Sequence, residues 1–92
     1  MNTFPLRIVT PEGPAFEGEV SIVVMRSTVG SFGVMANHSP MIVECPPGAL
    51  RAQDGRDRTI IFDCGHSVFT MDGTTAVVLT AFAQATTLPR ED

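Results

Sequence analysis

Near the middle of this 92-residue chain lies the stretch Gly30-Ser31-Phe32-Gly33-Val34-Met35-Ala36-Asn37-His38-Ser39-Pro40, which separates two groups of strand-like runs. The stretch holds two glycines, a proline and one of the two histidines of the chain. Glycine tolerates positive φ and close backbone approach, while Asn37, Ser39 and Pro40 are residue types that favour turns. We therefore predict a structured loop here, which ends one strand and begins another.

Short runs of alternating character on the N-terminal side of this loop predict β-strands. Phe4–Thr10 alternates apolar and polar residues with a period of two, and Phe16–Glu19 does the same before the β-branched run Ser21–Met25. After the loop, Met41–Val43 is another short apolar run. All of these runs are too short for confident helices, so we expect strands.

The second half of the chain continues this pattern. Asp54-Gly55 and Asp72-Gly73 are typical of tight hairpin turns, because Asp-Gly supplies the positive φ of a primed turn. Strand-like runs recur at roughly eight-to-twelve-residue spacing, as in β-sandwiches and barrels. The sequence therefore predicts an all-β fold, a flattened β-sandwich or barrel of mostly antiparallel short strands. Further strands are expected at Leu50–Gln53, Arg58–Asp63, Ser67–Met71 and Thr74–Thr80, with a bend at Cys64-Gly65-His66.

The core of such a fold is expected to contain apolar side chains from alternating strand positions. Thr80–Thr87 has some helical composition but is short. The expected core residues are Phe4, Leu6, Ile8, Ile22, Val24, Ile42, Ile60, Phe62, Phe69, Val77 and Leu79.

Charge and composition exclude several classes of function. The chain has a net charge of −4 and a pI near 4.9, and its six basic residues are scattered arginines. Binding to nucleic acid or to an anionic membrane surface requires a clustered basic face, so neither is expected. The sequence has no apolar run close to the ~20 residues of a spanning helix and no secretory signal pattern. We expect one soluble, cytoplasmic domain, whose small core leaves room for stabilisation by a partner.

Few residues are available for chemistry. The soft metal ligands are His38, Cys45, Cys64 and His66, and their spacing does not match the paired ligands of structural zinc sites. No base or orienting group identifies a Cys–His nucleophile, and Gly30–Gly33 lacks the lysine and helix of a phosphate-binding loop. We therefore expect no catalytic residue, metal or cofactor, and free, partly buried cysteines. A Cys/His metalloenzyme remains a hypothesis that the metal content of the purified chain would test.

Two interpretations of the central loop remain open. His38 can brace the turn by bonding backbone, or it can present an exposed imidazole to a partner. Phe32, Val34 and Met35 can fill the core under the loop, or they can form an apolar docking patch. For His38 the residues themselves favour the bracing role, whereas for the apolar residues the two roles are not exclusive.

Several turn signals occur in one order over about Phe4–Gln84, and in this order the chain resembles the N-terminal domain of the epsilon subunit of F-type ATP synthases. The resemblance is specific because these signals are unrelated to one another. They are Val9-Thr10-Pro11-Glu12-Gly13, Phe16-Glu17-Gly18-Glu19-Val20, the glycine loop ending in Asn37-His38-Ser39-Pro40, Pro47-Gly48-Ala49-Leu50 and Val77-Val78-Leu79.

The resemblance implies a β-sandwich of about ten strands on a rotating central stalk. In that family the domain contacts the gamma subunit along one side and the polar loops of the membrane c-ring at one end. The implied ring-facing residues are Gly30, Ser31, Phe32 and Gly33, with His38 beside them. The resemblance also implies a non-catalytic subunit, held peripherally at the cytoplasmic face of the bacterial inner membrane. The alternative is a stand-alone β-sandwich module that binds a protein or a small ligand.

The chain departs from the family pattern in three places. Met35-Ala36-Asn37-His38 lacks the usual proline, and Cys64-Gly65 stands where a Gly-Gly pair is common. Relatives also continue into a C-terminal helical hairpin that can block hydrolysis and in some bacteria binds ATP, whereas only thirteen residues run from Thr80 to Asp92. Two packed antiparallel helices with a connection need well over twice that number of residues at typical helix lengths. We expect a sandwich domain over 1–84, a short tail over 85–92 without a hairpin, and no nucleotide binding or motor locking.

Overall fold

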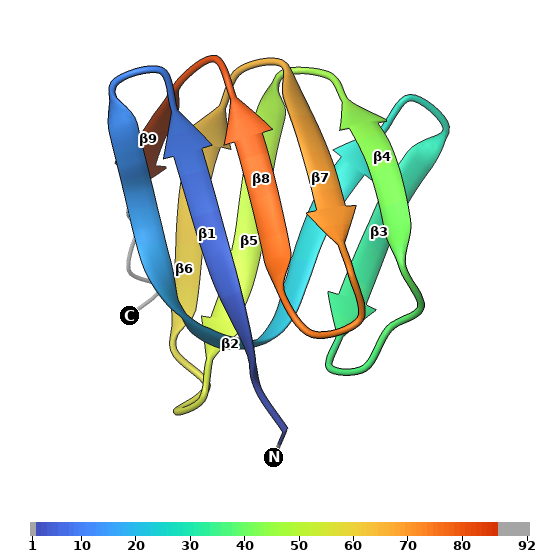
Figure 1. Ribbon diagram of the computed structural model, residues 1–92. Helices are drawn as coiled ribbons and strands as arrows, with labels where there is room; N and C mark the ends of the chain where they lie inside the picture. The colour runs from blue at the N-terminus through green and yellow to red at the C-terminus, as the bar shows by residue number, and fades with distance from the viewer. Residues whose placement is uncertain (1, 87–92) are drawn as a thin grey trace, which may run out of the picture.

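The computed structural model describes residues 2–86 and contains nine β-strands, with no helix among these residues (Figure 1). All neighbouring strands are antiparallel except β1 and β8, which are parallel. The strands are β1 (Phe4–Thr10), β2 (Gly13–Ser27), β3 (Gly30–Met35), β4 (Met41–Cys45), β5 (Gly48–Asp54), β6 (Thr59–Cys64), β7 (Ser67–Met71), β8 (Ala76–Thr80) and β9 (Ala83–Thr86).

The strands form one continuous sheet that folds over on itself. Its order is β4-β7-β8-β1-β2-β5-β6-β9, and β3 pairs with β2 outside this path. Figure 1 shows β4, β7, β8 and β1 in the front layer, with β3, β5, β6 and β9 behind them. The long strand β2 belongs to both layers, because it pairs with β1 along its first half and with β3 and β5 along its second. The prediction of an all-β, mostly antiparallel fold is confirmed. Both layers belong to one bent sheet, which does not close into a barrel.

A bulge in β2 explains part of the error in the expected core. Val20 and Ser21 are both buried although they are consecutive, and the pairing with β5 shifts between Val20 and Ile22. An extra residue reverses the inward and outward alternation beyond it. Val23 and Met25 therefore point into the core, and the expected Ile22 and Val24 point outward and are only half-buried.

Three other core predictions, in β4 and β8, are wrong because short apolar runs do not reveal which residues face inward. In β4 the inward residues are Met41, Val43 and Cys45, so Ile42 is 77% exposed. In β8 Val78 is fully buried, whereas the expected Leu79 is 53% exposed. The expected Val77 is also outward-facing and half-buried, and Ile60 packs at the margin of the core. The core contains Phe4, Leu6, Ile8, Val20, Val23, Met25, Val34, Cys45, Leu50, Ala52, Phe62, Cys64, Phe69, Met71, Ala76 and Val78.

The stretch predicted to be a loop is a strand over its first half. Gly30–Met35 forms β3, which pairs with the second half of β2, and only residues 36–40 connect it to β4. Phe32 and Val34 face inward, and the alternation places Ser31 and Gly33 outward. The two glycines suggested a loop, but neither prevents pairing, because Gly30 lies at the strand end and Gly33 lies on the exposed face.

The two Asp-Gly signals behave differently. At Asp72-Gly73 the glycine adopts the expected positive φ of 102°. At Asp54-Gly55 the predicted hairpin forms between β5 and β6, but its turn is wider than the tight primed turn expected, since residues 55–58 connect the strands and the positive φ of 64° belongs to Asp57. Oδ1 of Asp54 accepts the backbone N–H groups of Arg56 at 2.8 Å and Arg58 at 3.0 Å, so the aspartate closes a wider loop.

The C-terminal part of the described chain is a strand, which the sequence did not indicate. Ala83–Thr86 forms β9 and pairs with the free edge of β6, and it passes the expected domain boundary at residue 84 by two residues. Thr80 Oγ1 donates to the carbonyl oxygen of Phe82 at 2.9 Å and shapes the turn between β8 and β9. The rest of the predicted tail, residues 87–92, lies outside the described residues.

Candidate functional site

The end of the β2–β3 hairpin, residues 27–31, is a well-defined exposed projection, called here the hairpin tip. Ser27 Oγ accepts the Val29 N–H at 3.2 Å and donates to the Gly30 carbonyl oxygen at 2.9 Å. Gly30 has a φ of 136°, which side-chain-bearing residues rarely adopt. Val29 is 95% exposed. The tip thus presents an uncharged surface on a backbone that its own hydrogen bonds hold.

The four residues predicted to face a ring do not form one surface. Gly30, Ser31 and Gly33 are exposed, but the Phe32 ring points inward and packs edge-on against Phe69, with ring centroids 5.4 Å apart. Phe32 therefore anchors the hairpin to the core, which agrees with the core-filling interpretation of this residue. The exposed surface of this segment is formed by the backbone and small side chains of the other three residues.

His38 lies at the opposite end of β3 from the hairpin tip. Six strand residues separate the two ends by roughly 17 Å at the usual rise per residue. Asn37 has a φ of 66°, the His38 N–H donates to the Met35 carbonyl at 3.3 Å, and the ring Nδ1–H donates to the Ser39 carbonyl at 2.7 Å. The bracing role of His38 is confirmed, and the loop closes without the missing proline. The structure does not bring His38 together with Gly30–Gly33.

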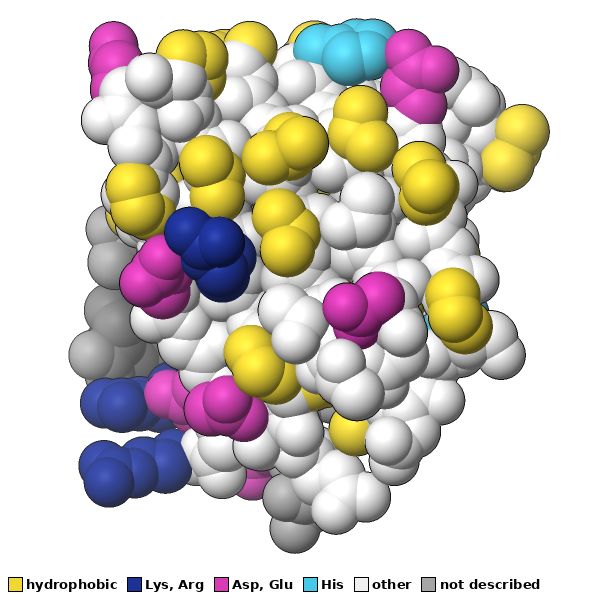
Figure 2. Space-filling model, in the orientation of Figure 1, with side chains coloured by type: hydrophobic (Ala, Val, Ile, Leu, Met, Phe, Trp, Pro, Cys, Tyr) yellow, Lys and Arg dark blue, Asp and Glu magenta, His cyan; other side chains and the backbone are white. Residues whose placement is uncertain are grey.

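Sequence reasoning missed an apolar surface on the front layer, called here the outer face. It consists of Val9, Ile42, Val68, Val77 and Leu79, which lie on the solvent side of β1, β4, β7 and β8. Leu79 stands in register between Val68 and Val9. Figure 2 shows these hydrophobic side chains gathered across the front of the molecule.

The surroundings of the outer face are polar on one side and hollowed on the other. Arg7 and Glu17 form an ion pair of 2.9 Å beside it, and both are about half exposed. A hollow of about 400 Å³ lies at the opposite edge and includes Ile42, Thr70 and Met71 among its lining residues. To identify this face from the sequence, one would need to know which residues of β4 and β8 point outward. The apolar runs Met41–Val43 and Ala76–Leu79 do not show this, because neighbouring residues in them are equally apolar.

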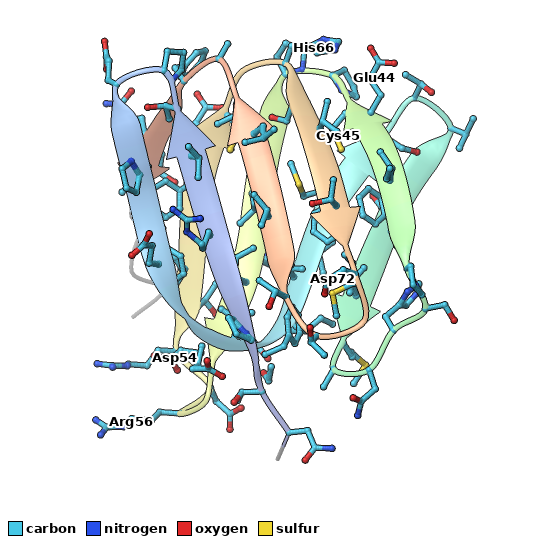
Figure 3. The ribbon with its side chains drawn as sticks, viewed as in Figure 1. Glu44, Cys45, Asp54, Arg56, His66 and Asp72 are labelled. Atoms are coloured by element: carbon cyan, nitrogen blue, oxygen red, sulfur yellow. The ribbon has the colours of Figure 1, made fainter. Side chains whose placement is uncertain are left out.

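The soft metal ligands are dispersed. His66 Nε2 lies 2.8 Å from Glu44 Oε2, and Figure 3 shows this pair at the upper end of the sheet. Both cysteines are buried and unbridged, and burial raises their pKa values; for Cys64 the nearby Asp63 and Cys45 add to this, and its pKa rises to about 11. Within residues 2–86 no three His, Cys, Asp or Glu side chains are grouped to hold a metal ion. This part of the chain also has no helix of the length and apolarity needed to cross a membrane.

Comparison with known protein families identifies the fold. Residues 3–84 match the model of the ATP synthase delta/epsilon chain β-sandwich domain. The chain belongs to this family. The match of the delta/epsilon domain spans both the hairpin tip and the outer face, and it favours the epsilon-type hypothesis over the stand-alone module.

Curated relatives agree with the family match. The chain is 35% identical over 80 residues to the ATP synthase epsilon chain of a Nitratiruptor species, covering 85% of this chain and 62% of that relative. It is 33% identical over 76 residues to the ATP synthase epsilon chain of Persephonella marina, covering 83% and 56%. This delta/epsilon chain therefore spans about three fifths of the length of these relatives.

Solved structures share the delta/epsilon fold at low sequence identity. A chain of the Euglena gracilis mitochondrial ATP synthase, in an OSCP/F1/c-ring structure, superposes with a TM-score of 0.85 and 15% identity, over 90% of this chain and 53% of that one. A chain of the Tetrahymena thermophila mitochondrial ATP synthase central stalk and c-ring gives 0.73 and 13%, over 90% and 66%. At such identities these likenesses establish the fold alone.

Proposed function

We propose that this chain is an epsilon-type subunit in the central stalk of an F-type ATP synthase. In this role it bridges the gamma subunit and the c-ring, couples ion flow to ATP synthesis, and catalyses no reaction itself. The observation that carries the proposal is the family match over residues 3–84 together with the epsilon-chain relatives. In this role the subunit is held through the complex, in a peripheral position at the cytoplasmic face of the bacterial inner membrane.

The outer face is the contact that we assign to gamma. Ile42 is 77% exposed and Leu79 is 53% exposed, although a small monomer gains stability by burying such side chains. Covering each of them stabilises a complex by roughly 1–2 kcal/mol. The hollow beside Ile42 offers a place for one side chain of the partner. Pro40 and Met41 also line this hollow, and His38 precedes them closely in the chain. We therefore assign His38 to the gamma side.

The hairpin tip is the contact that we assign to the c-ring. Gly30 and Ser31 are exposed at the tip and Gly33 is exposed further along β3, and small residues allow close approach of a partner backbone. The roughly 17 Å between the two ends of β3 argue that one ring surface contacts only one of them. The ring contact therefore keeps Gly30, Ser31 and Gly33, with Phe32 as its internal anchor, and does not include His38.

Copurification tests the proposal as a whole. The chain, tagged and expressed in its own organism, is isolated from gently solubilised membranes, and its partners are identified by mass spectrometry. We expect gamma and the ring subunit together with the other ATP synthase subunits. If the tagged chain is isolated without any ATP synthase subunit, under conditions in which the synthase itself stays intact, the proposal is contradicted. The stand-alone binding module then becomes the better interpretation.

Single substitutions test the gamma contact. Ile42→Glu places a charge on the proposed interface beside the hollow, and we expect at least about tenfold weaker binding to purified gamma, since an unpaired carboxylate must lose its water. Val29→Glu is the matched control, because Val29 is 95% exposed at the hairpin tip, which is not assigned to gamma. Urea unfolding should change little in either variant. Equal binding by both variants would place gamma elsewhere.

A further inference from the structure

Two arginines with no ion pair among residues 2–86 share one hollow next to the hairpin tip. Arg51 stands opposite Val24 in the β2–β5 ladder, and Arg26 is two residues further along β2 on the same exposed side. The diagonal spacing in a sheet puts their backbones roughly 7–8 Å apart. Ser31 pairs with Arg26 across the β2–β3 hairpin. Arg26, Arg51, Ser31 and Val24 line a hollow of about 300 Å³, called here the arginine groove.

The charge of the groove is unusual for this chain. The net charge is −4, and of the other arginines Arg7 is paired with Glu17 and Arg58 with Asp54. Asp63 stands diagonally across from Arg51 in the β5–β6 ladder, and the two make no ion pair. Two neighbouring guanidinium groups repel each other unless an anion lies between them. The groove is therefore complementary to a negatively charged group of a partner.

We propose that the arginine groove binds the carboxylate of an Asp or Glu in the polar loop of the c-ring. This inference rests on the proposed function, because the groove continues the surface of the hairpin tip: Ser31 belongs to both. A guanidinium binds a carboxylate through two parallel hydrogen bonds, so two arginines suffice for one acidic side chain. Val24 gives the groove an apolar wall that suits a small apolar neighbour of that acid.

Other anions fit the groove less well. Recognition of an anionic membrane surface typically uses four to eight basic residues. A polyphosphate is typically held by several backbone N–H groups at a glycine-rich loop or a helix N-terminus. The groove is lined by residues of β2, β3 and β5 together with Pro47, and no helix within residues 2–86 offers an N-terminus to it. A single protein carboxylate matches the two side chains and the size of the hollow.

Binding of the chain, in complex with gamma, to purified c-ring in phosphatidylcholine nanodiscs tests the proposal. Arg26→Gln combined with Arg51→Gln is expected to weaken binding at least about tenfold at low salt, the effect of losing charge-assisted hydrogen bonds. Arg56→Gln is the matched control, because Arg56 is an exposed arginine in the β5–β6 loop at the other end of the sheet (Figure 3), and it should bind like the wild type.

A second pair of variants fills the groove from within. Ser31→Glu places a tethered carboxylate opposite Arg26 and should compete with the ring, whereas Ser31→Gln has a similar size without the charge and should bind at least about tenfold more tightly than Ser31→Glu. A ring in which the acidic loop residue is replaced by Arg should no longer bind the wild-type chain. It should bind the double variant Arg26→Glu and Arg51→Glu instead.

The possible results separate the inference from the proposed function. If the wild type binds the ring and the Gln double variant binds equally well, the groove is not the contact and the proposed function still stands. If the wild type does not bind the ring, the proposed ring contact and the inference both fail. Arginine-dependent binding to ring-free vesicles that contain phosphatidylglycerol would show a lipid site and overturn the assignment to a carboxylate. A ring loop without any Asp or Glu would also overturn it.

Discussion

Two adjacent valines in β8 offer a direct test of how the core is built. Val78 is fully buried and stands in register between Ile8 and Phe69, which are also fully buried. Val77 points to the other side of the sheet, between Arg7 and Thr70, and is half-buried. Replacing each valine by threonine keeps its volume and its branched shape, so the two substitutions differ mainly in where they place a hydroxyl group.

The expected cost follows from these environments. In Val78→Thr the new hydroxyl faces apolar side chains, and the neighbouring backbone groups of β8 pair with β1 and β7. A buried hydroxyl without a partner costs about 1–3 kcal/mol, whereas surface changes stay within about 0.5 kcal/mol. A chain of 92 residues has a total stability of about 5–14 kcal/mol. Val78→Thr should therefore lower the melting temperature by about 8–16 °C for a cost near 2 kcal/mol.

Urea unfolding of both variants, followed by circular dichroism, measures the difference in the free energy of unfolding. We expect Val78→Thr to unfold at a clearly lower urea concentration and Val77→Thr to unfold close to the wild type, with unchanged slopes. Equal costs at the two positions, or a larger cost at Val77, would refute the inward orientation of Val78 and with it the alternation in β8. Such a result would support the phase that we first predicted from the sequence.

Three more predictions follow from the turns and thiols. Backbone N–H groups of Thr74 and Thr75 lower the pKa of Asp72 in the folded protein. The ionised Asp72 therefore stabilises the fold above the unfolded pKa of 3.8, and this stabilisation is lost as the pH falls through the lower folded pKa. Asp72→Asn should reduce the loss of unfolding free energy over this acid range. With a pKa of about 11, the Cys64 thiol is only about 0.1% thiolate at pH 8, and it should react with iodoacetamide far more slowly in folded than in unfolded protein. Gly65→Ala should cost about 1–3 kcal/mol in urea unfolding, because its Cβ would lie 2.9 Å from the Phe82 ring, and Phe82→Leu should recover part of that loss.

The sequence was sufficient to predict seven of the nine described strands, because most of their connections carry glycine, proline or aspartate. It did not indicate β9, and its glycines suggested a loop where β3 lies. It was not sufficient to predict which side of some strands faces the core. The bulge at Ser21 depends on the pairing of β2 with β5, which lies more than thirty residues further along the chain. In β4 the residues Met41, Ile42 and Val43 are all apolar, so their composition does not distinguish the two faces.

The candidate site shows the same limit in another form. Grouping Gly30–Gly33 with His38 followed their closeness in the sequence, and the stretch between them was expected to be a loop. Because that stretch is the strand β3, it holds the two groups apart instead of bringing them together. The outer face has no motif either, since Ile42 and Leu79 are ordinary strand residues that become a surface only through the order β4-β7-β8-β1. Long-range pairing decides both features.

The bent strand β2 gives a physical reason for using this fold between two partners. Its first half pairs with β1 beside the outer face, and its second half pairs with β3 and carries the hairpin tip. In the proposed function, a force applied by the ring at the tip therefore reaches the gamma contact along one continuous strand and its hydrogen-bond ladders, without passing through a loop. Loops yield more readily than paired strands, because fewer buried contacts and hydrogen bonds hold them. The outer face and the arginine groove lie on different layers, so in the proposed function gamma and the ring bind at once and are kept at a fixed distance.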